Sequence, residues 1–139
     1  MFNRLVHPIM RFVTAVLPQM RECREGKIIV VNSATPLRAV PALSAYAAAR
    51  AAQNGYVKVV GAEVSSHNVQ LNAIAQHFTI GGFPEDAMQD PQTARWVEKE
   101  VPAQRLSRGV TSRPHCVCIW LHPKAILYRD RLFPLRVAG

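Results

Sequence analysis

Three side chains in the sequence, Ser33, Tyr46 and Arg50, have the types and the spacing that suit the handling of a substrate alcohol. Tyr46 and Arg50 are four residues apart, so they share one face of a helix. A free phenol has a pKa near ~10, and a fixed cation within hydrogen-bonding range favours its phenolate form. Ser33 follows the apolar run 28–31, and its hydroxyl can donate to or accept from the same substrate oxygen. The spacing predicts a proton-transfer site; the alternative is a surface tyrosine on an alanine-rich helix, with Ser33 as a turn former.

The elements that must position these residues are predicted from hydrophobic spacing. Residues 3–24 keep a helical apolar stripe, and Gly26 follows them as a typical helix stop. Residues 27–32 are an apolar strand without alternation, which predicts burial on both faces of a parallel sheet. A second long helix is expected over 43–66 and a second strand over 69–75. This order predicts half of a doubly wound α/β sheet.

The serine, the tyrosine and a basic residue stand at a spacing that resembles a known active-site segment. Twelve residues separate Ser33 from Tyr46, and three separate Tyr46 from Arg50, as in the short-chain dehydrogenase/reductase superfamily. The basic residue there is normally lysine, and arginine in its place resembles the halohydrin dehalogenases, a branch that lost its cofactor. The similarity covers roughly residues 3–107, which is most of the chain, and includes Gly26-Lys27-Ile28-Ile29, His67-Asn68-Val69 and Asn72-Ala73-Ile74-Ala75-Gln76-His77. It implies an α/β fold, the C-terminal half of a Rossmann-like doubly wound parallel sheet whose N-terminal βαβ half is absent.

This resemblance implies a lyase-type activity that converts vicinal haloalcohols to epoxides and halide, and that runs in reverse. Tyr46, activated by Arg50, would take the proton of the alcohol, and Ser33 would hold its oxygen. No cofactor is expected. The segment after the second strand is either an ordinary surface loop or, by the same resemblance, the halide site, whose candidate residues are Gln76, His77, Phe78, Thr79 and Phe83.

Two other functions stay open. One is an NAD- or NADP-dependent reductase of the parent superfamily, where the lysine also bonds the nicotinamide ribose. Arg50 is the discriminating residue, because the planar fork of arginine is not an equivalent replacement. The other is an inactive fragment that associates with full-length subunits. The resemblance implies a homo-tetramer built through the long helices 3–24 and 43–66. The sequence contains no G-x-G-x-x-G or G-x-x-x-G-x-G turn, but the dehalogenases also lack a working one.

Composition and charge restrict the class of protein. With 49% apolar and 19% charged residues, the chain is expected to be globular, and no apolar run approaches the ~20 residues that span a bilayer. The net charge of +8 is uneven: residues 1–105 carry +3 and residues 106–139 carry +5, without a nucleic-acid-binding motif. Neither nucleic acid nor a membrane is therefore an expected partner. Three cysteines without a disulfide framework or metal-site spacing, and no signal peptide, indicate the cytoplasm.

The sequence divides near residue 107. Residues 1–107 are interpreted as a partial α/β domain of this family, whereas residues 108–139 depart from its pattern. One hypothesis for this tail is a frameshift, because codons can be chosen for 129–139 whose neighbouring frame resembles the last strand of the family. The nucleotide sequence of the gene tests this hypothesis.

Overall fold

The computed structural model describes residues 1–37, 40–76, 79–80, 89–100, 107–108 and 133–134. Its main elements are α1 (Phe2–Cys23), β1 (Gly26–Ser33), α2 (Ser44–Val64) and β2 (Val69–Gln76). Their order and type are as predicted, with boundaries within two residues of those expected from the sequence. The shorter elements are the 3-10 turns η1 (Thr35–Leu37) and η2 (Ser65–His67), the strands β3 (Thr79–Ile80), β4 (Ser107–Arg108) and β5 (Phe133–Pro134), and the helix α4 (Pro91–Glu100).

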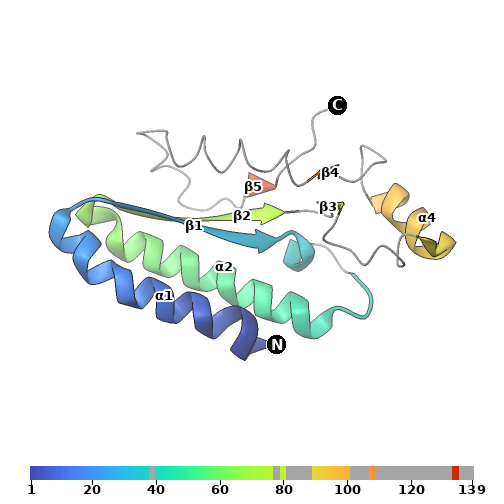
Figure 1. Cartoon of the computed structure of the whole chain (residues 1–139), viewed down its shortest axis with the longest axis horizontal. Helices are drawn as coiled ribbons and strands as arrows, with labels where there is room; N and C mark the ends of the chain where they lie inside the picture. Colours follow the sequence, from blue (N-terminus) through green and yellow to red (C-terminus); the bar gives the residue numbers. More distant parts are fainter. Residues whose placement is uncertain (38–39, 77–78, 81–88, 101–106, 109–132, 135–139) are drawn as a thin grey trace.

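The two long strands form a parallel pair at the centre of the structure (Figure 1). Their register runs from Gly26 opposite Val69 to Ser33 opposite Gln76, and β5 pairs in parallel with the other side of β2. Because parallel strands end at the same edge of a sheet, Ser33 and Gln76 lie side by side. The predicted Rossmann-like α/β fold with a parallel sheet is confirmed.

Helices α1 and α2 lie together on one face of the sheet (Figure 1). Their buried side chains meet those of the strands in one apolar cluster, which consists of Val13, Ile28, Val30, Val57 and Leu71. Removing such side chains from water contributes roughly 25 cal/mol per Å² of apolar surface. Most of the apolar stripe predicted for residues 3–24 lies in or against this cluster, whereas Phe12 of the same stripe is 63% exposed.

The burial of β1 differs from the prediction of two covered faces. Ile28 and Val30 are buried. Val31, which lies between Val30 and the buried Asn32, is 53% exposed. The reason is that α1 and α2 both cover the same face, and within the described ranges no helix lies over the opposite one (Figure 1). The uninterrupted apolar run 28–31 thus conceals an alternation of covered and open positions.

The end of the sheet opposite Ser33 is closed by two residues in the left-handed backbone region. Arg24 (φ 52°) ends α1, and Asn68 (φ 59°) ends η2 just before β2. Asn68 Nδ2 donates to the Arg24 carbonyl oxygen at 2.8 Å, and Arg24 Nη2 donates to the Ser66 carbonyl oxygen at 3.1 Å. Asparagine tolerates this conformation better than most residues, which suits Asn68 to the turn before β2.

In the described part, no helix combines the length and the apolar character needed to cross a bilayer. Of residues 107–139, the structure describes only 107–108 and 133–134, so the division near residue 107 stays a prediction.

Two glycines of α2 give a matched test of how closely the helix lies on the sheet. A Cβ atom added at Gly61 would be 2.9 Å from the Leu71 carbonyl oxygen, whereas one added at Gly55 would meet nothing within 4 Å. Gly61→Ala is expected to lower the free energy of unfolding by about 1–3 kcal/mol through overpacking. Gly55→Ala is expected to raise it by about 0.5–1 kcal/mol, because alanine is the better helix former.

Denaturant unfolding of the two variants against the parent chain measures both effects. Equal changes in the two free energies of unfolding would contradict a tight approach of α2 to β2 at Gly61.

Candidate functional site

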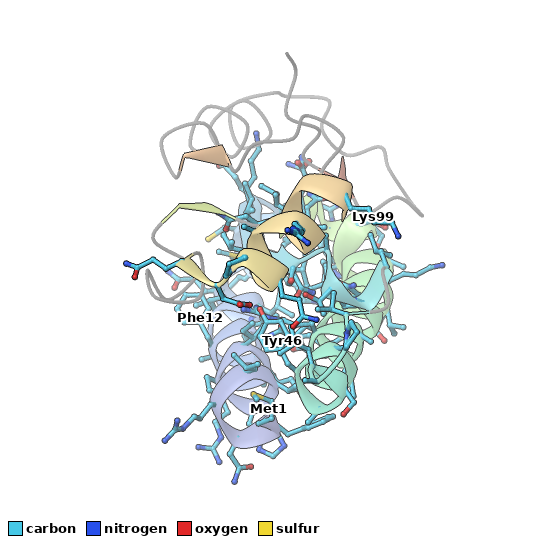
Figure 2. All side chains as sticks on the ribbon, turned by 90° about the vertical axis from the view of Figure 1, so that its right-hand side faces the viewer. Met1, Phe12, Tyr46 and Lys99 are labelled. Carbon is cyan, nitrogen blue, oxygen red and sulfur yellow. The ribbon has the colours of Figure 1, made fainter. Side chains whose placement is uncertain are left out.

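The predicted site residues gather at the edge where β1 and β2 end. Ser33 is the last residue of β1, and the N–H of Ala34 donates to the carbonyl oxygen of Gln76 at 2.9 Å. Figure 2 looks toward this end of the molecule, and Tyr46, from the first turn of α2, lies there. In open α/β sheets, ligands bind beyond the carboxyl ends of the strands, so this edge is where a substrate is expected.

Arg50 holds its charge over the ring of Tyr46. The guanidinium carbon Cζ lies 5.0 Å from the centre of the Tyr46 ring, a distance at which a cation is attracted to an aromatic face. Both side chains are half-buried and stand one turn apart on α2. The i, i+4 spacing thus brings the cation and the phenol together on one face of the helix, as predicted.

The guanidinium is anchored by one of its terminal nitrogens. Arg50 Nη1 donates to the carbonyl oxygen of Val31 at 3.3 Å and to Oε1 of Gln53 at 3.1 Å. The Nε atom of Arg50 is buried and has no hydrogen-bond partner among the described residues. Since a buried donor without a partner costs free energy, the position of this side chain is set by its other contacts.

The hydroxyl of Ser33 is engaged within its own turn. Its Oγ lies 2.7 Å from Oγ1 of Thr35, and the N–H of Thr35 donates to the same Oγ at 3.1 Å. Thr35 is 7% exposed. When the Thr35 hydroxyl donates to Ser33, the proton of Ser33 is left for another acceptor, such as a substrate oxygen. Thr35 can therefore set the direction in which Ser33 donates.

Asn32 joins the end of β1 to α2. It is 3% exposed, its Nδ2 donates to the Arg50 carbonyl oxygen at 3.0 Å and to Oδ1 of Asn54, and its Oδ1 accepts the N–H of Ser33 at 2.8 Å. The same amide thus bonds the backbone of Ser33 and the backbone of Arg50. It fixes the strand that carries the serine against the helix that carries the tyrosine and the arginine.

Two of the five predicted halide-binding residues lie in the described part of the chain. Gln76 ends β2 beside Ser33, and Thr79 lies in β3. The other three candidates, His77, Phe78 and Phe83, lie outside the described residues.

Three buried polar residues around the site were not predicted: Asn32, Thr35 and Gln53. Two of them carried a signal in the sequence. Asn32 directly follows four apolar strand residues, and Gln53 lies three residues after Arg50, on the same helical face. Polar residues at such places indicate internal hydrogen bonds, because a buried amide must be paired.

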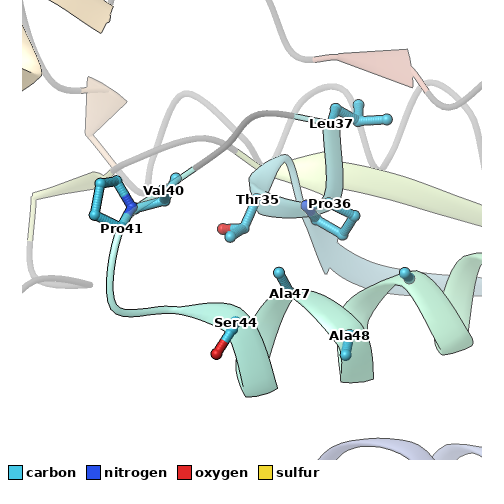
Figure 3. Close-up of a pocket in the computed structure, with 9 residues that line it drawn as sticks. Thr35, Pro36, Leu37, Val40, Pro41, Ser44, Ala47 and Ala48 are labelled. Atoms are coloured by element: carbon cyan, nitrogen blue, oxygen red, sulfur yellow. The ribbon is translucent and has the colours of Figure 1, made fainter.

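An apolar pocket of about 610 Å³ lies beside the site, between η1 and the first turns of α2 (Figure 3). Thr35 and Ser44 provide its polar lining, and Ala47 and Ala48 leave space for it. Neither Tyr46 nor Arg50 is among its lining residues, since they occupy another face of α2. The pocket is therefore a neighbour of the predicted proton-transfer site rather than its chamber. Among the described residues, no group of three or more His, Cys, Asp or Glu side chains is arranged for a metal ion.

The Asn32 junction predicts a large effect on stability. Asn32→Ala is expected to lower the free energy of unfolding by about 2–3 kcal/mol, because the N–H of Ser33 and the side chain of Asn54 lose a partner in a buried place. Denaturant unfolding measures this loss. The matched control is Asn3→Ala on the exposed side of α1, which is expected to change stability by less than about 0.5 kcal/mol. A loss at Asn32 no larger than that at Asn3 would contradict the junction.

Comparisons with known proteins give relatives of two kinds. The chain is 34% identical over 104 residues to a 3-oxoacyl-(acyl-carrier-protein) reductase of Chlamydia trachomatis serovar D, an alignment that covers 75% of this chain and 41% of the relative. Several other curated relatives are likewise named as reductases or dehydrogenases. The chain spans about two fifths of the length of the first of these relatives.

Solved structures add both the fold and a second kind of relative. A structure titled as a dehalogenation enzyme is similar in fold, with a TM-score of 0.79 at 24% identity, over 94% of this chain and 54% of that one. A halohydrin dehalogenase bound to ethyl (2S)-oxiran-2-ylacetate is 28% identical, with a TM-score of 0.62, over 80% of this chain and 49% of that one.

The family itself is shown by the amino-acid sequence. The family model described as short chain dehydrogenase matches residues 1–87, which include β1, α2, β2 and all three predicted catalytic residues. The parallel sheet with two helices on one face agrees with this match. The chain belongs to the short-chain dehydrogenase family.

Proposed function

We propose that the site deprotonates a substrate alcohol and, in its preferred reaction, converts a vicinal haloalcohol to an epoxide and halide. The observation that carries this proposal is the guanidinium of Arg50 over the ring of Tyr46, with Nη1 fixed by two protein acceptors. Arginine stays charged under ordinary conditions, and a tyrosine beside such a fixed cation is suited to act as the general base toward an alcohol.

The proposed reaction uses Tyr46 as the base and Ser33 as the group that holds the substrate oxygen. Tyr46 takes the proton of the substrate hydroxyl, and the hydroxyl of Ser33 donates to the same oxygen. This oxygen attacks the neighbouring carbon, a C–O bond forms, and the carbon–halogen bond breaks with its electron pair on the halide. No oxidation state changes, so the step needs no hydride carrier.

The departing halide needs a place beside the reacting carbon. Gln76 stands in register with Ser33 at the same edge of the sheet and, by resemblance, is a candidate to contact this anion. Its side chain carries an NH₂ group that can donate to an anion. The structure of the halohydrin dehalogenase with a bound oxirane, at 28% identity, supports this substrate class.

A second candidate function is an NAD(P)-dependent oxidoreductase, and the names of the curated relatives favour it over the first. A dinucleotide needs a glycine-rich turn for its pyrophosphate and a donor for its nicotinamide ribose. Nη1 of Arg50, at the place of the lysine, donates to Val31 and Gln53, so this donor is engaged by the protein itself.

Halide release from a small bromo-alcohol tests the first function against the second. Tyr46→Phe is expected to lower the rate by about 10²–10⁴-fold, because the base is lost. Tyr56→Phe is the matched control on the same helix. The Tyr56 hydroxyl donates to the Met10 carbonyl oxygen at 3.4 Å, away from the site, so the rate of halide release by this variant is expected to equal that of the parent chain.

The same preparation separates the alternatives. Oxidation of NAD(P)H with a ketone, and no halide release, would replace the dehalogenase with the reductase. A cooperatively unfolding chain with neither activity would favour the inactive fragment. Halide release that survives Tyr46→Phe would reject the mechanism.

We also propose that the chain associates with further copies through the outer surfaces of its long helices. Phe12 on α1 is 63% exposed and Val59 on α2 is 57% exposed, and packing of the long helices against another copy would cover these apolar side chains. Sedimentation of the chain is expected to show an oligomer that Phe12→Ser weakens. A monomer at micromolar concentration would contradict this proposal.

A further inference from the structure

Gln53 is the most deeply buried polar side chain that the structure describes. It lies on α2 and is 1% exposed. Burial of an amide is costly unless both its ends are hydrogen-bonded, and both ends of this one are. Nε2 donates to the carbonyl oxygen of Leu5 on α1, and Oε1 accepts from Nη1 of Arg50 at 3.1 Å.

The two partners fix the orientation of the amide. The carbonyl oxygen of Leu5 can only accept, and the guanidinium of Arg50 can only donate. If the amide turned over, an oxygen would face an oxygen at Leu5 and an NH₂ group would face the guanidinium. A side chain that only filled space here would need neither group, and methionine has a similar length and volume.

Among the described residues, the amide is one of two acceptors of the Arg50 guanidinium. The other is the carbonyl oxygen of Val31, and both accept from Nη1, while the buried Nε has no partner among the described residues. Arginine has a long side chain with many rotamers, and each fixed contact removes some of that freedom. Two acceptors at one nitrogen restrict the plane of the guanidinium and keep its carbon 5.0 Å from the ring centre of Tyr46.

We infer that Gln53 is a positioning residue that clamps the guanidinium of Arg50 over Tyr46 and links it to the first turns of α1. The inference rests on the proposed function for its catalytic consequence. Among the described residues, the hydrogen bonds of Gln53 go to Leu5 and Arg50, so its influence on the reaction is expected to pass through Arg50. Loss of the clamp is expected to lower kcat and to leave KM unchanged.

The first test measures Arg50 directly and needs no turnover. The Nε–H group of Arg50 is followed by ¹⁵N NMR, assigned through its loss in Arg50→Lys. In Gln53→Met, hydrogen exchange at this group is expected to be at least about tenfold faster, because the guanidinium gains freedom to leave its buried place. The matched control is Val57→Ala on the same face of α2, which lowers stability without a polar contact to Arg50. Exchange that is equal in Gln53→Met and the parent chain, or equally faster in both variants, would overturn the clamp.

The second test is a double-mutant cycle on halide release. Gln53→Met is expected to lower kcat by about tenfold in the parent chain and to have no further effect in an Arg50→Ala background, because both changes remove the same contribution. A merely structural role would lower both rates by the same factor, and that result would overturn the positioning role. A chain without halide release would reject the proposed function, whereas the exchange measurement decides the clamp by itself.

Discussion

The hydrogen bonds of Asn32 join the end of β1 to the backbone of α2, and the relative position of the candidate catalytic groups depends on that junction. Its amide bonds the N–H of Ser33 on one side and the carbonyl of Arg50 on the other. Both partners are main-chain groups, so the junction fixes the backbones and not only side chains. The eight paired positions of β1 and β2 then carry Gln76 to the same edge. This one amide thus fixes the end of β1 against α2.

Much of the fold follows from the sequence because the relevant signals are local. The apolar stripe of residues 3–24 and the run 28–31 are enough to predict α1 and β1, and the spacing of Tyr46 and Arg50 places them on one helical face. The burial of β1 could not be read in the same way. An apolar strand residue such as Val31 indicates a covered position only when some other element lies over that face, and a local pattern does not report on distant elements.

The polar residues around the site were harder to predict for a different reason. Thr35 and Gln53 belong to types that are mostly found at surfaces, and their burial depends on partners far away in the sequence. Gln53 bonds a carbonyl of α1 that lies 48 positions earlier, and Thr35 is buried where the chain turns back over α2. Such contacts are consequences of tertiary packing. The side chains that support a site are therefore less visible in a sequence than the side chains that react.

The two functional candidates differ in what they require of one cation. In a reductase, the group that faces the tyrosine must also serve a bound dinucleotide, which suits a compact, mobile ammonium. In the structure, Arg50 is instead turned inward, and its Nη1 is occupied by the protein. The curated relatives are named mostly as reductases and dehydrogenases, whereas the proposed dehalogenase rests on the role assigned to Arg50 beside Tyr46. In both proposals, Tyr46 would exchange a proton with a substrate oxygen.

The acceptors that hold Gln53 and Arg50 are the carbonyl oxygens of Leu5 and Val31. Every amino acid has a main-chain carbonyl oxygen, so residues 5 and 31 can be replaced by others of suitable shape without loss of the hydrogen bonds to Gln53 and Arg50. Residues 50 and 53 cannot vary in this way, because a change at one of them removes the hydrogen-bond partner of the other. Across homologous genes, residues 50 and 53 should therefore change together, while residues 5 and 31 vary independently of them.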